Sequence, residues 1–211
     1  MFDPKLLIQG QGTLNYHYLD KLEFVLKNAL SEYPRTLAIR IDLHLSPSWF
    51  NNDMPFCAPN LSSDLMARFT RSLMAQIDSY RQQLTKHGKR AHPCKLRYYW
   101  VREIETSCSS HYHALLFVNK DLFWLLGSFN SENHTLSSMI QKAWLSALRL
   151  KGNDEYRALV HFPDNATYVL DRNQPDFTDH YNAFVYRASY LAKERSKAYS
   201  VSDRSIGYSQ K

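Results

Sequence analysis

The chain of 211 residues has few cysteines and no apolar run long enough to cross a membrane. Its three cysteines, Cys57, Cys94 and Cys108, form no CxxC pair. An odd number of such thiols indicates a reducing compartment and argues against a disulfide framework. The first twelve residues lack the apolar core of a signal peptide, and no internal repeat or low-complexity tract is visible. We therefore expect a cytoplasmic protein without a membrane partner.

The composition is that of a folded, moderately basic protein. Hydrophobic residues make up 44% of the chain and aromatic residues 14%, which is enough for a sizeable core. Lys and Arg number 26 against 20 Asp and Glu, so the formal net charge is +6. A basic balance favours polyanionic partners, either nucleic acid or an anionic membrane surface.

Hydrophobic periodicity predicts four helices and four strands. Apolar residues at helical spacing indicate helices over 13–31, 62–86, 135–150 and 178–196, whereas alternation indicates strands over 36–45, 95–105, 111–118 and 157–162. Residues 164–171 fit neither pattern clearly. The βαββαβ order in the middle predicts an α+β fold with an RRM-like antiparallel sheet. Its helices would lie on one face and leave the other open, and an additional C-terminal helix would carry a tyrosine.

Two histidines, His111 and His113, flank Tyr112 in the predicted strand 111–118. Side chains two residues apart share one face of a strand, so the two imidazoles point together and Tyr112 points away. Imidazoles in this arrangement can chelate a divalent metal. The alternative is a polar strand face without a ligand.

Acidic residues on the preceding strand strengthen the metal interpretation. With a connection over 106–110, Glu105 lies opposite His111 and Glu103 opposite His113. A mixed site of histidine and carboxylate suits Mg²⁺ or Mn²⁺ in phosphate chemistry. We favour Glu103 over Glu105 because it lies deeper in the strand. A zinc site that includes Cys108, or surface Glu–His pairs without a metal, are the other possibilities.

Charged and polar residues also occupy the same predicted face beside this cluster. On separate strands they can bind backbone phosphates, contact the metal or be ordinary solvated side chains. These candidates for nucleic-acid binding are Arg40, Asp42, His44, Lys95 and Arg97.

The predicted C-terminal helix places Tyr190 in the middle of a basic face. The apolar stripe of this helix lies roughly opposite Tyr190, and Lys193 is its i, i+3 neighbour. A phenol is a weak nucleophile, so it needs a metal-polarised phosphodiester or a nearby cation such as Lys193. A solvated surface tyrosine is the simpler interpretation of a YxxK motif taken alone. The same face adds three candidates for nucleic-acid contact, Tyr186, Arg187 and Lys197.

These motifs occur in an order that resembles the HUH endonuclease superfamily. More closely, the chain resembles the inovirus and prophage replication-protein family that includes the YagK/YfjJ C-terminal domain. The resemblance covers about residues 30–211. It is carried by Pro34-Arg35-Thr36 to Leu45, Trp100-Val101-Arg102-Glu103, His111-Tyr112-His113-Ala114-Leu115-Leu116, Ala143-Trp144, Ala188-Ser189-Tyr190-Leu191-Ala192-Lys193 and Arg204-Ser205-Ile206-Gly207-Tyr208-Ser209.

The resemblance implies an endonuclease that initiates rolling-circle replication at a single-stranded origin. A Mg²⁺ or Mn²⁺ ion on His111, His113 and Glu103 would polarise the scissile phosphate. Tyr190 would attack it, leaving a 5′-phosphotyrosine and a free 3′-OH, and Lys193 would position or neutralise the phosphate.

In this interpretation residues 1–35 form an N-terminal helical extension packed on an HUH endonuclease-like domain of residues 36–211. No GxxxxGK[ST] motif is present, so unwinding would need a host helicase, as extension would need a host polymerase. The expected location is the cytoplasm of a bacterial host. Two alternatives remain: a non-catalytic prophage protein that binds single-stranded nucleic acid and retains the fold, and a transposase or relaxase with the same chemistry.

Overall fold

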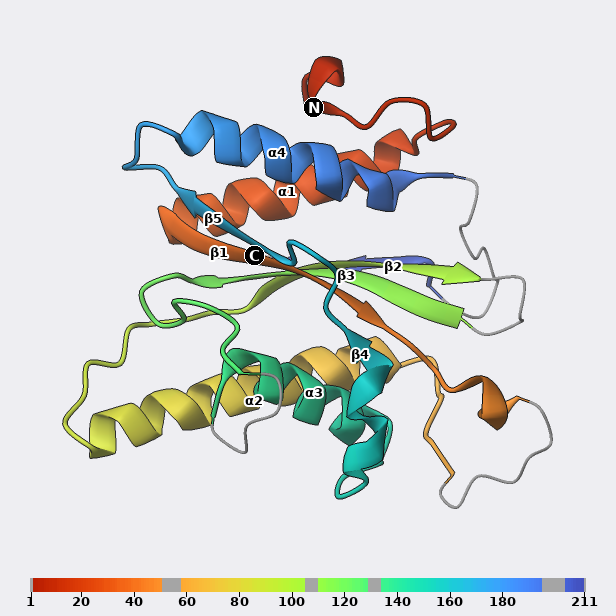
Figure 1. Cartoon of the computed structure of the whole chain (residues 1–211), viewed down its shortest axis with the longest axis vertical. Helices are drawn as coiled ribbons and strands as arrows, with labels where there is room; N and C mark the ends of the chain where they lie inside the picture. Colours follow the sequence, from red (N-terminus) through yellow and green to blue (C-terminus); the bar gives the residue numbers. More distant parts are fainter. Residues whose placement is uncertain (1, 51–57, 105–109, 129–133, 195–203, 211) are drawn as a thin grey trace.

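A single antiparallel sheet forms the middle layer of the protein in the computed structural model, with helices on both sides of it (Figure 1). The structure describes residues 2–50, 58–104, 110–128, 134–194 and 204–210. Among these, no helix is both long and apolar enough to span a bilayer.

The sheet has six strands in the described part of the chain, and the strand order along it is β4-β1-β3-β2-β6, with β5 also paired to β1. Each pairing is antiparallel, which confirms the prediction of an α+β fold with an antiparallel sheet. The strands are β1 (Arg35–Leu43), β2 (Arg97–Ile104), β3 (Ser110–Asn119), β4 (Val160–His161), β5 (Thr167–Asp171) and β6 (Ile206–Tyr208).

The four α-helices match the predicted positions, although their ends differ. The side chains of Asn15 and Thr135 cap two of them by accepting backbone N–H groups. The helices are α1 (Tyr16–Glu32), α2 (Leu65–Lys86), α3 (Leu136–Ala147) and α4 (Phe177–Ser189), and the 3₁₀ turns are η1 (Pro4–Leu6), η2 (Pro47–Trp49), η3 (Asp154–Leu159) and η4 (Tyr190–Ala192).

The two helices of the βαββαβ unit, α2 and α3, lie on a single face as predicted, but α1 and α4 cover the other face, so the prediction that this face is open is wrong. Ile39 and Ile41 of β1 belong to the core beneath α2 and α3, whereas Leu115 and Phe117 of β3 belong to the core beneath α1 and α4. Two separate cores result, one on each side (Figure 1). The physical reason is visible in β3, which is apolar on both faces beyond its histidines and therefore needs cover on both.

The remaining strands differ from the sequence prediction. The segment 164–171 contains β5, whereas the first half of the predicted strand 157–162 belongs to η3 and only two of its residues form β4. The polar tail adds β6 at the edge beside β2, where Gly207 pairs with Trp100. A Cβ on Gly207 would collide with the Trp100 ring, so glycine allows this close approach.

Candidate metal centre

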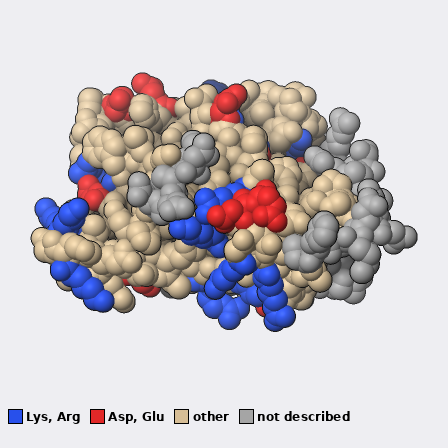
Figure 2. Space-filling model, turned by 60° about the horizontal axis from the view of Figure 1, so that its bottom comes forward, with Lys and Arg blue, Asp and Glu red and all other residues tan. Residues whose placement is uncertain are grey.

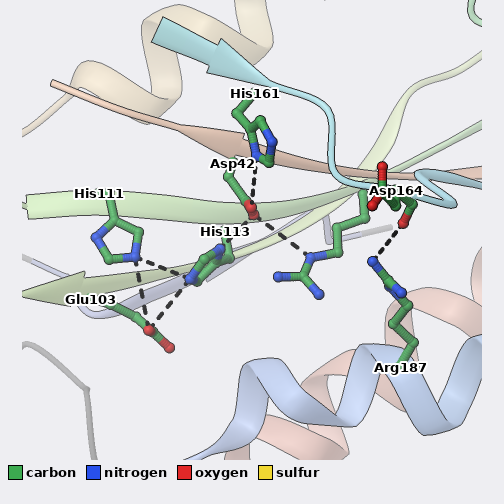
Figure 3. A network of polar contacts seen from close by, with 8 residues as sticks. Asp42, Glu103, His111, His113, His161, Asp164 and Arg187 are labelled. Carbon is green, nitrogen blue, oxygen red and sulfur yellow. Dashed lines mark hydrogen bonds and ion pairs between the residues drawn. The ribbon is translucent and has the colours of Figure 1, made fainter. Parts of the chain in front are cut away.

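Three ionisable side chains converge at one end of the face that α1 and α4 cover. Glu103 comes from β2, and His111 and His113 come from β3. All three are buried, with exposed fractions of 4%, 6% and 8%. Among the residues that the structure describes, these three bring their ligand atoms close enough together to hold one metal ion (Figure 3).

The spacing of the three ligand atoms suits a small divalent cation. The two histidine Nε2 atoms lie 3.1 Å apart, and Glu103 Oε2 lies 3.4 Å from Nε2 of His113 and 3.9 Å from Nε2 of His111. The point equidistant from the corners of this triangle is about 2.0 Å from each. Protein oxygen and nitrogen ligands bind Mg²⁺ and Zn²⁺ at about 2.0–2.2 Å. The residues therefore fit a metal ion, and the geometry does not select among such ions.

The strand register explains why Glu103 is the carboxylate at this site. Glu103 pairs with His111, whereas the sequence prediction placed Glu103 opposite His113 and Glu105 opposite His111. The observed pairing is displaced by two residues, and an even displacement keeps each side chain on its face. Glu105 and Cys108 lie outside the described residues.

Asp42 of β1 orients His113 from behind the metal centre. Its Oδ1 accepts a hydrogen bond from Nδ1 of His113 at 2.5 Å (Figure 3). An ionised carboxylate can only accept, so Nδ1 of His113 carries a proton, and in the neutral imidazole, the form that binds a metal, the lone pair of Nε2 points toward Glu103 and His111. Such a carboxylate behind a histidine is a common support of metal ligands. The structure therefore places Asp42, which the sequence suggested as a nucleic-acid contact, behind the metal centre.

The electrostatics of this pair favour the ionised carboxylate. Burial raises the pKa of Asp42, but the hydrogen bond and charge of His113, with Arg40 nearby, outweigh it and lower the pKa to about 2. Burial lowers the pKa of His113, yet the hydrogen bonds to Asp42 and Glu103 outweigh it and raise the pKa above its ordinary value. Asp42 is thus a permanent negative charge beside the ligand.

Two cations, Lys193 and Arg40, lie near the ring of Tyr190, and Arg40 also contacts Asp42 beside the metal centre. Lys193 Nζ is 3.7 Å from the centre of the tyrosine ring, and the Arg40 guanidinium carbon is 5.7 Å from it. Nε of Arg40 is in turn 3.7 Å from Oδ1 of Asp42. A continuous line of contacts therefore runs from Tyr190 through Arg40 and Asp42 to His113.

The helix that was predicted to carry Tyr190 ends one residue before it. Tyr190 begins the turn η4, and Lys193 leaves that turn with an extended backbone. The reason is a bridge between Leu14 and Lys193, because Asn15 N donates to the carbonyl of Ala192 and Glu194 N donates to that of Thr13. These contacts, from residues far away in the sequence, replace the helical hydrogen bonds.

The remaining predicted residues divide into neighbours of the metal centre and residues with other partners. His44 stacks on His111 with ring centres 5.7 Å apart. Arg97 instead forms an ion pair with Glu32 of α1, Nη2 to Oε2 at 2.6 Å, so its guanidinium already has a carboxylate partner. Lys95 precedes β2 at the end of that strand remote from Glu103.

On α4, Tyr186 is 49% exposed one turn before Tyr190. Arg187 donates from Nη2 to the carbonyl of Asp164 at 2.6 Å (Figure 3). Lys197 lies outside the described residues. Tyr112 packs against Trp100 and Trp144 on the opposite face, as its position in the strand predicts.

Sequence reasoning missed His161. Its Nδ1 lies 3.5 Å from Oδ2 of Asp42, because β4 pairs with β1 so that these two residues are opposite each other. The alternation of residues in β1 predicts that Asp42 lies on the polar face of that strand. No sequence pattern predicts the short pairing of β4 with β1 that brings His161 to Asp42.

The fold and the site define an α+β protein with a buried candidate metal centre next to a tyrosine. The chain belongs to the YagK/YfjJ C-terminal domain family, whose model matches residues 2–209. It is 39% identical over 203 residues to the uncharacterized protein YagK of Escherichia coli (strain K12), covering 95% of this chain and 97% of that protein. It is 33% identical over 195 residues to the uncharacterized protein YfjJ of the same strain, covering 92% and 93%. No solved structure matches the chain.

Proposed function

We propose that this protein is a replication initiation endonuclease of a phage or prophage, of the HUH type, that nicks single-stranded origin DNA through Tyr190. The observation that carries the proposal is the line of contacts from the Glu103–His111–His113 cluster to Tyr190. The RRM-like order of elements expected from the sequence and the resemblance of its motifs to HUH replication proteins support it further.

Each residue has a role in the proposed reaction. Glu103, His111 and His113 would hold a Mg²⁺ or Mn²⁺ ion, which would supply a Lewis acid for a phosphodiester oxygen. Tyr190 Oη attacks the phosphorus, so that an O–P bond to tyrosine forms while the P–O3′ bond breaks. The phenol gives up one proton and the 3′ oxygen takes one up, so the transfer needs no further reactant. Lys193 and Arg40 stabilise the negative charge that develops.

The products are a 5′-phosphotyrosine and a free 3′-OH. The 3′-OH can prime a host polymerase, with a host helicase to separate the strands, in the cytoplasm of the bacterial host. Reversal of the transfer can rejoin a displaced strand, because the phosphotyrosine conserves the energy of the phosphodiester bond.

A labelling experiment tests the nucleophile and the polarity together. The full chain is incubated with Mn²⁺ and a pool of randomised single-stranded oligonucleotides, labelled at the 3′ end in one sample and at the 5′ end in another. We expect an SDS-resistant adduct that carries the 3′ label only. Tyr190→Phe removes the adduct, whereas Tyr186→Phe, which changes an exposed tyrosine one turn away, retains it.

An adduct of wild-type amount in Tyr190→Phe would show that another nucleophile acts. Binding of single strands without any adduct would instead favour the non-catalytic alternative, a nucleic-acid-binding protein that retains the fold.

A further inference from the structure

A basic groove lies on the far side of the sheet from the candidate metal centre. It is a cavity of about 360 Å³ between α2, α3 and η3. Its polar lining comes from Ser72 and Gln76 of α2, from Lys142 and Ser146 of α3, and from Lys151, Asp154 and Arg157. The volume falls in the range of small-ligand sites, at about 300–1,000 Å³.

The groove has a surplus of positive charge. Lys142 and Lys151 form no ion pair with any residue in the described ranges, and Arg157 pairs with the exposed Asp154 at 2.9 Å. Figure 2 turns this side toward the viewer and shows Lys and Arg side chains beside and below a central acidic patch, with a second group of them near the left edge. Ammonium groups together with the hydroxyls of Ser72 and Ser146 are donors that suit phosphate oxygens.

A short segment connects the groove to the metal centre along the edge of the sheet. Arg157 lines the groove from η3, and His161, four residues later in β4, contacts Asp42. Figure 1 shows this segment running between the sheet and the layer of α2 and α3. At about 2.0–3.4 Å per residue, the four residues span roughly 8–14 Å. Stacked nucleotides advance about 3.4 Å each, so this span corresponds to about two to four phosphates.

We propose that this groove binds phosphates of the DNA strand that flanks the scissile phosphate, with Lys142 and Lys151 as the principal contacts. The strand would pass from the metal centre over His161 and along η3 into the groove. The inference rests on the proposed function, because that function places a single strand at the metal centre.

Salt-dependent binding tests the groove without any nicking. The affinity of the full chain for a fluorescent single-stranded 20-mer is measured by anisotropy in EDTA at several salt concentrations. Lys142→Gln with Lys151→Gln removes two phosphate contacts, so the slope of log K against log salt becomes shallower by about 1.4. The corresponding loss of affinity at 0.1 M salt is about 25-fold. The matched control, Lys86→Gln with Lys89→Gln at the exposed end of α2, removes the same charge away from the groove.

An unchanged slope in the groove variant, or an equal change in the control, would overturn the inference. A loss seen only with a duplex of the same sequence would overturn it as well, because the groove would then bind double-stranded DNA. Thermal unfolding at the wild-type temperature confirms that the variant is folded. The adduct experiment is independent of this one. If the groove variant binds DNA more weakly but the wild type forms no adduct, the proposed endonuclease activity is rejected. If the wild type forms the adduct but the groove variant binds DNA as the wild type does, the proposed role of the groove is rejected.

Discussion

The hydrogen bond between Asp42 and His113 makes a quantitative prediction about metal affinity. Asp42→Asn keeps the shape of the side chain and an acceptor oxygen for Nδ1 of His113, but it removes the buried negative charge. Loss of such a supporting carboxylate lowers metal affinity about 10–100-fold. This corresponds to about 1.4–2.8 kcal/mol of binding free energy. We expect Asp42→Asn to bind Mn²⁺ more weakly by this factor in calorimetric titration of the protein without DNA.

Two comparisons make the measurement decisive. His113→Ala removes a ligand, so its loss of Mn²⁺ affinity should exceed that of Asp42→Asn. Asp121→Asn changes an aspartate that pairs with Arg35 at the other end of β1, so its affinity should equal the wild-type value. If Asp42→Asn binds Mn²⁺ as tightly as the wild type, the carboxylate does not support the ligand and the reasoning fails.

Two further predictions concern stability and are measured by urea unfolding. Arg97→Ala breaks the ion pair with Glu32 and should lower the free energy of unfolding by about 1–3 kcal/mol. The affinity of this variant for single strands should equal that of the wild type. A variant of wild-type stability that binds DNA more weakly would show instead that Arg97 contacts phosphate. Gly207→Ala places a Cβ against the Trp100 ring and should cost about 1–3 kcal/mol; a neutral result would mean that β6 does not pack on Trp100 as described.

Much of the candidate site follows from local properties of the chain. In a strand, the face of a side chain depends only on its parity, so the sequence alone places His111 and His113 together and Tyr112 on the opposite face. The same parity assigns Glu103 to the histidine face. That assignment remained correct although the predicted register was displaced, because the displacement was even.

Other features required the tertiary structure because contacts between distant segments determine them. The alternation of polar and apolar residues in β1 places Asp42 on the polar face of the strand, but only the pairing of β1 with β3 brings Asp42 to His113. Helical periodicity continues past Tyr190, yet the bridge from Leu14 to Lys193 ends the helix there. The apolar residues on both faces of β3 indicate that both faces need cover, but only the tertiary structure shows that α1 and α4 supply it on the histidine face.

The sequence by itself therefore determined which residue types face the same way on each strand, since backbone geometry repeats every two residues. Apart from the pairing of β2 with β3, which the short connection between them predicts, only the tertiary structure decided which strands lie side by side, where α4 ends and which cations lie near Tyr190. Hydrogen bonds and packing between segments far apart in the chain control those outcomes, and no local pattern records them.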